Sequence, residues 1–248
     1  MTTIIMARSN NFSAIMSDTR ENLYEYEDVP YKDGVQKLFS FSSKGMGYIT
    51  GAGSAEFLNE VKQKAITKRH ISNINEINNI FDTTAQECKR LDPNWAEDIV
   101  QSYIAYSWYG EDYSGDNMFG INLVSESYIP YLGSNVRSIN EGELKIIYPA
   151  DLADKKNFTD VMQAKEQSFN VNEMPISKTI FEMLRMFREI SSISTLSNSE
   201  CQIGIQYLSN LSKTIHKAEL SGDVKKLINI AQKNKILTKF KTVDEITL

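Results

Sequence analysis

The sequence predicts an α+β fold in which antiparallel strands and helices occupy separate stretches of the chain. Short apolar or alternating runs, bounded by turn residues, fill roughly the first fifty residues and recur between 101 and 148. Longer stretches with apolar residues at helical spacing follow each group of strands. This grouped order favours stacked sheets with helices outside them over a series of βαβ units.

The N-terminal strands form two predicted hairpins. The runs 3–7 and 12–16 make the first hairpin, with turn residues between them. The alternating segment 35–41 and the run 46–50 make the second. Between the hairpins, residues 21–34 are acidic and rich in tyrosine, and they contain Pro and Gly, so we expect a loop there.

The remaining elements follow from apolar spacing and turn residues. The predicted helices cover 54–65, 74–91, 158–169, 176–193 and 224–237. The predicted strands cover 102–110, 118–126, 128–134, 143–149 and 201–208. No linker-like stretch divides the chain, so we expect one domain over 1–208 and a C-terminal helical extension over 209–248.

Composition limits the classes of function. Lys and Arg number 27 and Asp and Glu 32, a net charge of −5, which argues against a nucleic-acid partner. No apolar stretch of spanning length and no leader-like pattern occurs, so we expect no membrane partner and a cytoplasmic location. Cys88 and Cys201 are expected to be buried free thiols. With only two histidines, a His-rich metal site is excluded, and we expect no cofactor.

Removal of Met1 would give Thr2 a free α-amine beside its own hydroxyl. A threonine hydroxyl is a poor nucleophile until a base takes its proton, and an α-amine with a pKa of about 8 can do so. The site then needs a cation that favours the neutral amine and an anion that positions this cation. It also needs a backbone N–H for an oxyanion, typically at a glycine.

The sequence offers one residue for each of these roles. Asp18 ends the second predicted strand, Lys37 lies in the third, and Gly51 ends the fourth. A hairpin returns the end of its second strand to the start of its first, so Asp18 is expected beside Thr2.

Four short motifs stand in one register and resemble those of proteasome β-type subunits and the bacterial proteasome-like peptidase of the ATP-dependent heat-shock protease. The motifs are T-T at 2–3, S-D-T-R at 17–20, V-Q-K-L at 35–38 and T-G-A-G at 50–53. The resemblance implies a four-layer αββα sandwich of the N-terminal-nucleophile hydrolase type over 1–208. It also implies a threonine-dependent amide-bond hydrolase, with Thr2 as nucleophile, Asp18 and Lys37 as electrostatic support and Gly51 as oxyanion donor.

The resemblance extends further along the chain with two departures. Ser134, in L-G-S-N at 132–135, takes the place of the family's auxiliary serine, although a strand-like segment follows it instead of a helix. Ser199 takes the place of a late serine, but Leu196 stands where the family has an aspartate. The implied partners are a peptide or protein substrate and copies of the chain in a homo-oligomeric ring. An ATP-dependent unfoldase is a further implied partner, although no sequence feature identifies one.

Other interpretations remain open at this point. Asp18 also suits a hairpin turn, Lys37 an exposed edge strand, and Ser134 a turn. The missing aspartate allows a non-catalytic or divergent scaffold subunit, and the fold also allows an enzyme that transfers acyl groups or cleaves small amides. The glycine-rich segment 44–58 resembles the start of a dinucleotide-binding turn, but Glu56 stands where the third glycine belongs.

Overall fold

The computed structural model describes residues 2–22, 31–68, 71, 74–111, 115–126, 134–209 and 214–247 of the 248-residue chain. The strands are β1 (Ile4–Arg8), β2 (Phe12–Asp18), β3 (Glu21–Asn22), β4 (Tyr31–Lys32), β5 (Phe39–Ser40), β6 (Met46–Ala52), β7 (Tyr103–Glu111), β8 (Asn117–Glu126), β9 (Ser134–Ser138), β10 (Leu144–Ile147), β11 (Glu200–Ser209), β12 (Thr214–Asp223) and β13 (Lys241–Thr247). The helices are α1 (Ala55–Thr67), α2 (Asn75–Leu91), α3 (Trp95–Val100), α4 (Lys156–Ser168), α5 (Ile176–Ser191) and α6 (Val224–Gln232), with 3₁₀ turns η1 (Ala150–Leu152), η2 (Val171–Glu173) and η3 (Leu237–Lys239).

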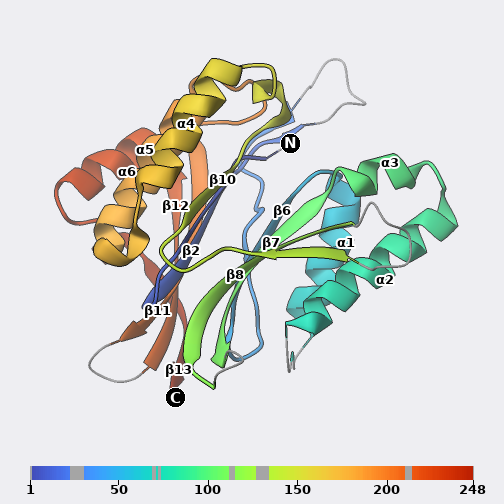
Figure 1. Ribbon diagram of the computed structural model, residues 1–248, viewed down its shortest axis with the longest axis horizontal. Helices are drawn as coiled ribbons and strands as arrows, with labels where there is room; N and C mark the ends of the chain where they lie inside the picture. The colour runs from blue at the N-terminus through green and yellow to red at the C-terminus, as the bar shows by residue number, and fades with distance from the viewer. Residues whose placement is uncertain are drawn as a thin grey trace.

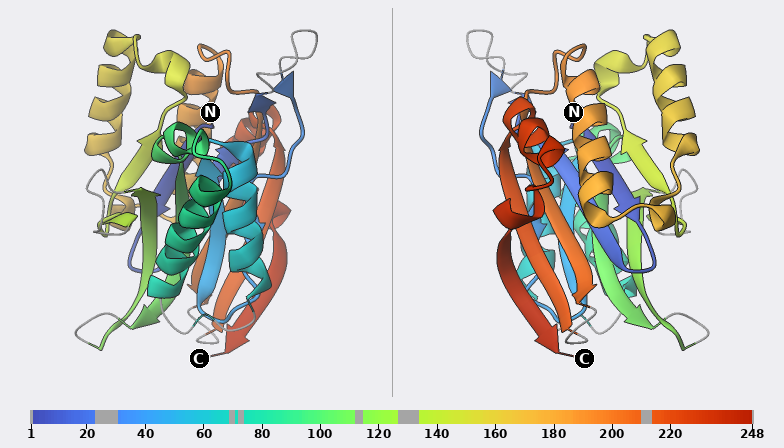
Figure 2. Two further views of the ribbon diagram at one scale, coloured as in Figure 1. Left: turned by 90° about the vertical axis from the view of Figure 1, so that its right-hand side faces the viewer. Right: turned by 90° about the vertical axis from the view of Figure 1, so that its left-hand side faces the viewer.

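Two sheets stack face to face, and helices cover both outer faces (Figure 1). The six-stranded sheet has the order β10-β1-β2-β11-β12-β13, and α4, α5 and α6 lie on its outer side (Figure 2). The five-stranded sheet has the order β5-β6-β7-β8-β9, with α1, α2 and α3 on its outer side. This four-layer αββα arrangement confirms the predicted fold class.

The first two strands, β1 and β2, are buried along their whole length because layers pack against both of their faces. Ile4 and Met6 of β1 pack between the two sheets, where they join Tyr48 of β6. Ile5 and Ala7, the alternate residues of β1, pack instead beneath the helices of the first sheet. The start of the chain is therefore enclosed by well-packed layers on both sides, and Thr2 is held where β1 begins.

The helices of the second sheet pack through the predicted apolar face. Phe57 of α1 and Phe81 of α2 meet edge to face with ring centroids 5.2 Å apart. Ile49 of β6 and Ile104 of β7 lie in the same buried cluster. Because α1 follows β6 directly and packs against the same cluster, the first turns of α1 lie close to Gly51.

Two expectations about elements are corrected. Residues 209–248 are not a helical extension: β12 pairs with β11 from Thr214 to Asp223, and β13 pairs with β12. Residues 35–38 are not strand, because the N–H groups of Lys37 and Leu38 donate to the side chain of Gln202 and not to a neighbouring strand.

The dinucleotide-binding interpretation also fails on topology. β6 and β7, which flank α1 to α3, pair antiparallel, as do all strand pairs in the described part of the chain. A dinucleotide-binding turn requires parallel strands joined by a crossover helix.

Among the helices of the described residues, none combines the length and the apolar character that a membrane span requires.

Candidate active site

The β1–β2 hairpin places Asp18 against the start of the chain. Ile4 pairs with Ser17, so the next position on each strand faces the other across the hairpin. The Asp18 N–H donates to the Thr3 carbonyl over 3.3 Å, and the Thr3 N–H donates to Asp18 Oδ2 over 2.9 Å. The carboxylate is thus anchored one residue from Thr2 by a backbone donor.

Lys37 connects this carboxylate to Thr2. Its ammonium donates to Thr2 Oγ1 over 2.9 Å and to Asp18 Oδ1 over 2.6 Å. The Arg20 carbonyl accepts a third hydrogen bond, which saturates the three donors of the ammonium. The structure therefore brings Thr2, Asp18 and Lys37 into one hydrogen-bonded group.

A loop, not a strand, carries Lys37. Gln202 Oε1 of β11 accepts from the Lys37 N–H at 2.8 Å and from the Leu38 N–H at 3.0 Å. The Val35 N–H donates to the Thr19 carbonyl over 2.9 Å. These contacts satisfy the backbone that a sheet would otherwise pair, and they fix the direction of the lysine side chain.

The group is almost entirely shielded from water. Asp18 is 0% exposed, Thr2 5% and Lys37 8%. A buried ion pair is tolerable only when its remaining donors and acceptors are also satisfied, as they are here. Removal from water also strengthens the field that the ammonium exerts on Thr2 Oγ1.

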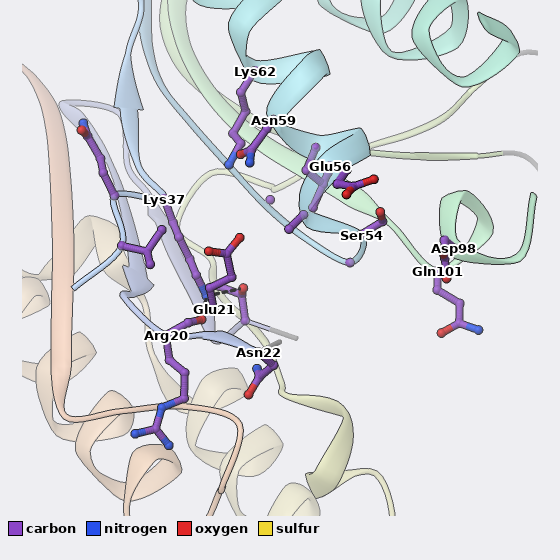
Figure 3. Close-up of a pocket in the computed structure, with 17 residues that line it drawn as sticks. Arg20, Glu21, Asn22, Lys37, Ser54, Glu56, Asn59, Lys62, Asp98 and Gln101 are labelled. Atoms are coloured by element: carbon purple, nitrogen blue, oxygen red, sulfur yellow. Dashed lines mark hydrogen bonds between the residues drawn. The ribbon is translucent and has the colours of Figure 1, made fainter. Parts of the chain in front are cut away.

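The group opens onto a cavity of about 670 Å³ between the hairpin, β6 and α1. Thr2, Lys37 and Gly51 all line it, together with residues from the first turns of α1. Figure 3 shows Lys37 on one side of this space and the side chains of α1 on the other. Three of the sequence-predicted residues thus share one cavity, with Asp18 buried behind them.

Gly51 lies where the backbone of β6 is open on one edge. β5 pairs with β6 only at Tyr48 and Ile49, so β5 leaves the edge of β6 after Ile49, where Gly51 lies, without a pairing strand. A side chain at position 51 would place its Cβ 2.9 Å from the Tyr103 carbonyl and 3.0 Å from Leu58. The site therefore requires a glycine, and backbone groups there are accessible to a ligand in the cavity.

Ser134 and Ser199 lie elsewhere, contrary to the expected grouping. Ser134 begins β9 opposite Glu126, and β9 lies three strands from the β6 strand that carries Gly51, about 14 Å at the usual strand spacing. Leu132 and Gly133 of its motif lie outside the described residues. Ser199 lines a separate hollow beside Arg20 and does not line the Thr2 cavity.

Ser197, which the sequence reasoning missed, is the serine that reaches the N-terminal strand. Thr3 Oγ1 donates to Ser197 Oγ over 3.0 Å. Residues 194–199 contain three serines, so a shift of two positions in the assumed register selects Ser199 instead of Ser197. Its neighbour Asn198 accepts from the Thr19 N–H over 3.3 Å and donates to Thr19 Oγ1 over 2.9 Å.

Asp151 supplies the acidic group of this loop from a distant part of the chain. It accepts from Ser194 Oγ over 2.8 Å and from the Thr195 N–H over 2.7 Å. Burial would raise the pKa of Asp151, but these hydrogen bonds outweigh burial and hold the pKa below its ordinary value. Asp151 thereby fixes the loop that carries Ser197. Leu196, which stands where the family has an aspartate, cannot accept these hydrogen bonds through its side chain.

Neither cysteine of the chain is activated as a nucleophile, and the described residues offer no cluster of metal ligands. Burial raises the pKa of Cys201, which is paired opposite Asp18, so its thiol stays protonated. Burial likewise raises the pKa of Cys88. Among the described residues, no group of three or more His, Cys, Asp and Glu side chains is arranged to hold a metal ion.

The fold of the chain is distantly similar to a proteasome-like fold. A similar solved structure is a variant of Anbu from Hyphomicrobium sp. strain MC1, with a TM-score of 0.59 and 11% sequence identity. The match covers 98% of this chain and 100% of the Anbu chain. No family model matches the sequence, and no curated protein matches it. At this identity the likeness establishes the fold alone.

Proposed function

We propose that the chain is a threonine-dependent amide-bond hydrolase of proteasome-like type, with Thr2 as its nucleophile and a peptide or protein as its substrate. One observation carries the proposal: the Lys37 ammonium lies 2.9 Å from Thr2 Oγ1 at the wall of a cavity. Asp18, buried behind the lysine, holds this ammonium in place. The distant proteasome-like fold supports the assignment at the level of fold.

The reaction begins once the bond between Met1 and Thr2 is cleaved, because only then does Thr2 carry a basic amine. The amine takes the Oγ1 proton, directly or through a water, and Oγ1 attacks the substrate carbonyl. The Lys37 charge stabilises the negative charge that develops on Oγ1 and favours the neutral form of the amine. Collapse of the tetrahedral intermediate transfers the proton of the Thr2 ammonium to the substrate nitrogen, expels it as an amine and leaves an ester on Thr2. Water then hydrolyses this ester, which releases the acid and restores the Thr2 hydroxyl.

Gly51 is proposed as the oxyanion donor. Its backbone lies in the part of β6 that β5 does not pair, and it lines the same cavity as Thr2. Preorganised backbone donors of this kind are worth about 3 kcal/mol of transition-state stabilisation. Asp18 and Lys37 act on charge and position, while Ser197 orients the start of the strand through its hydrogen bond with Thr3.

We also propose that copies of the chain assemble into a homo-oligomeric ring, as the proteasome-like fold suggests. Light scattering coupled to size-exclusion chromatography measures this directly. A monomer at micromolar concentration contradicts the ring without contradicting the chemistry at Thr2.

The test of the function is turnover by a chain prepared with Thr2 as its first residue. Hydrolysis of fluorogenic peptides should fall by about 10³-fold or more in Thr2→Ala, because removing the nucleophile leaves only binding and oxyanion stabilisation. Thr2→Ser keeps both the hydroxyl and the amine, and it should retain part of the activity. Circular dichroism and the unfolding midpoint of each variant serve as controls for folding.

Unchanged turnover in Thr2→Ala would sink the mechanism. Cleavage of small amides but not of peptides would favour the small-amide or acyl-transferring alternative within the same fold. No turnover by a folded, correctly processed chain would favour the scaffold alternative.

A further inference from the structure

Lys62 of α1 is a buried cation that faces the Thr2 cavity. Ala55, Asn59 and Lys62 recur at helical spacing and all line this space. Figure 3 shows Asn59 and Lys62 extending from α1 toward the side of the cavity that carries Lys37. Lys62 is only 5% exposed, although most lysines keep their ammonium in water.

No side chain or carbonyl among the described residues pairs with the Lys62 ammonium. The ammonium lies over the ring of Phe39, whose centroid is 5.2 Å from Nζ. Burial of an ammonium without a hydrogen-bonded partner is unfavourable. Burial, together with the charge of Lys37 and against that of Glu21, accordingly lowers the pKa of Lys62 to about 8. The ammonium is still mostly protonated near neutral pH, and no carboxylate of the described residues forms an ion pair with it.

The other cations of the cavity are already occupied. Lys37 donates to Asp18 and Thr2. Arg20 forms a bidentate pair with Asp33, at 2.8 and 3.0 Å. The acidic residues Glu21, Glu56 and Asp98 also line the space, and the charge of Glu21 acts on Lys62, but none of the three forms an ion pair with it. Of the described cations that line the cavity, Lys62 is therefore the one available to a ligand.

We infer that Lys62 binds a carboxylate of the substrate, so that peptides with an acidic side chain beside the attacked carbonyl are preferred. The inference rests on the proposed function, because it assumes that the carbonyl lies next to Thr2 Oγ1. The side chain adjacent to that carbonyl then enters the cavity that Thr2 and Lys62 share. A carboxylate there supplies the missing hydrogen-bonded partner of a buried ammonium. An uncharged amide of the same shape forms a weaker hydrogen bond with the ammonium.

The test compares two acetylated tripeptide amides, Ala-Ala-Glu and Ala-Ala-Gln, which differ only in the charge of the last side chain. Calorimetric titration of the Thr2→Ala chain measures binding without turnover. The acidic peptide should bind at least about tenfold more tightly, the usual gain from a charge-assisted hydrogen bond. In Thr2→Ala/Lys62→Met this preference should vanish, and in Thr2→Ala/Lys62→Arg it should persist.

Two controls separate this effect from general electrostatics. Lys64 lies on the same helix, forms an exposed ion pair with Glu87 and does not line the cavity, so Lys64→Met should keep the preference. The preference should also weaken as the pH rises through about 8, because the Lys62 ammonium then loses its proton. Glu21 and Lys37, the charged groups that act on Lys62, are unchanged in every variant compared.

Equal affinity for the two peptides, a preference that survives Lys62→Met, or no binding of either peptide overturns the inference. Turnover by the wild-type chain is measured in parallel. An acidic preference in binding without any turnover contradicts the proposed function and supports the role of Lys62. Turnover without any preference supports the function and contradicts the role of Lys62.

Discussion

At the scale of single residues, Lys37 and Asp18 form a buried ion pair to which the proposed mechanism also gives a chemical role. The carboxylate is 0% exposed, and its two oxygens accept from the Lys37 ammonium and from the Thr3 and Arg20 N–H groups. Such a pair is expensive to break, because one partner is then left buried and charged. Its contribution to stability and its contribution to chemistry can therefore be separated by mutating both partners.

Lys37→Met should lower the free energy of unfolding by about 3 kcal/mol, since it leaves the Asp18 carboxylate buried without its cation. Lys37→Met/Asp18→Asn should recover most of this loss, because the neutral amide needs no counter-charge. Neither variant should turn over peptide substrates. Guanidinium unfolding and peptide hydrolysis measure the two effects, and a double variant no more stable than Lys37→Met contradicts the charge argument.

At the scale of elements, the segment that carries Lys37 depends on one side chain of β11. Gln202 Oε1 accepts the N–H groups of both Lys37 and Leu38. The segment has no strand partner at these residues, so Gln202 replaces the hydrogen bonds of a sheet. The position of the lysine is thus set by a residue 165 positions away in the sequence.

Gln202→Leu should lower kcat by about tenfold or more and leave KM less affected, because it frees the Lys37 segment while the cavity remains. Hydrogen exchange at the amides of Lys37 and Leu38 should accelerate, since both lose their acceptor. Gln202→Glu keeps acceptor oxygens at this place and serves as the matched control. Unaltered exchange at both amides in Gln202→Leu would show that other contacts hold the segment.

The sequence predicted the hairpins and most helices, because their apolar spacing is regular. It missed β12, since Lys217 gives that segment a polar appearance. In the structure Lys217 is 1% exposed, and its ammonium donates to the Phe41 carbonyl over 2.7 Å. Lys62 was overlooked for the same reason: pattern reading assigns lysine to the surface, and only tertiary contacts reveal a buried one.

The candidate site was predictable where residues are linked by hairpin geometry, as for Asp18, or stand in one of the four motifs, as for Lys37 and Gly51. Asp18 follows from the hairpin register, and the structure places it beside Thr2 and Thr3. Ser197 and Asp151 are brought to the site by loops and long-range contacts, which no spacing in the sequence encodes.

At the scale of the whole molecule, the two sheets approach each other closely at a glycine. A Cβ added at Gly204 of β11 would lie 2.5 Å from Cγ of Tyr48 in β6. Tyr48 is fully buried between the sheets, so its ring has no room to move away. Gly204 and Tyr48 thus join, at close range, the sheet that contains β1 and the sheet that carries Gly51.

Gly204→Ala should destabilise the protein by about 1–3 kcal/mol through overpacking. It should also reduce turnover, because the separation of Thr2 and Gly51 changes with the separation of the sheets. Gly110→Ala is the control, since its Cβ would meet only Trp108 at 3.8 Å. Thermal unfolding that is equal for the two variants contradicts the close-packing argument.

The most direct measurement of the central claim is the intact mass of the protein after incubation with a peptide that carries a threonine-directed electrophile. The chain should begin at Thr2, released from a cleavable N-terminal fusion, and the chain that keeps Met1 is the comparison. We expect one adduct, located on Thr2 by fragmentation, in the processed chain and none in the chain with Met1. A folded, processed chain that gains no adduct, or gains it at another residue, would contradict Thr2 as the nucleophile.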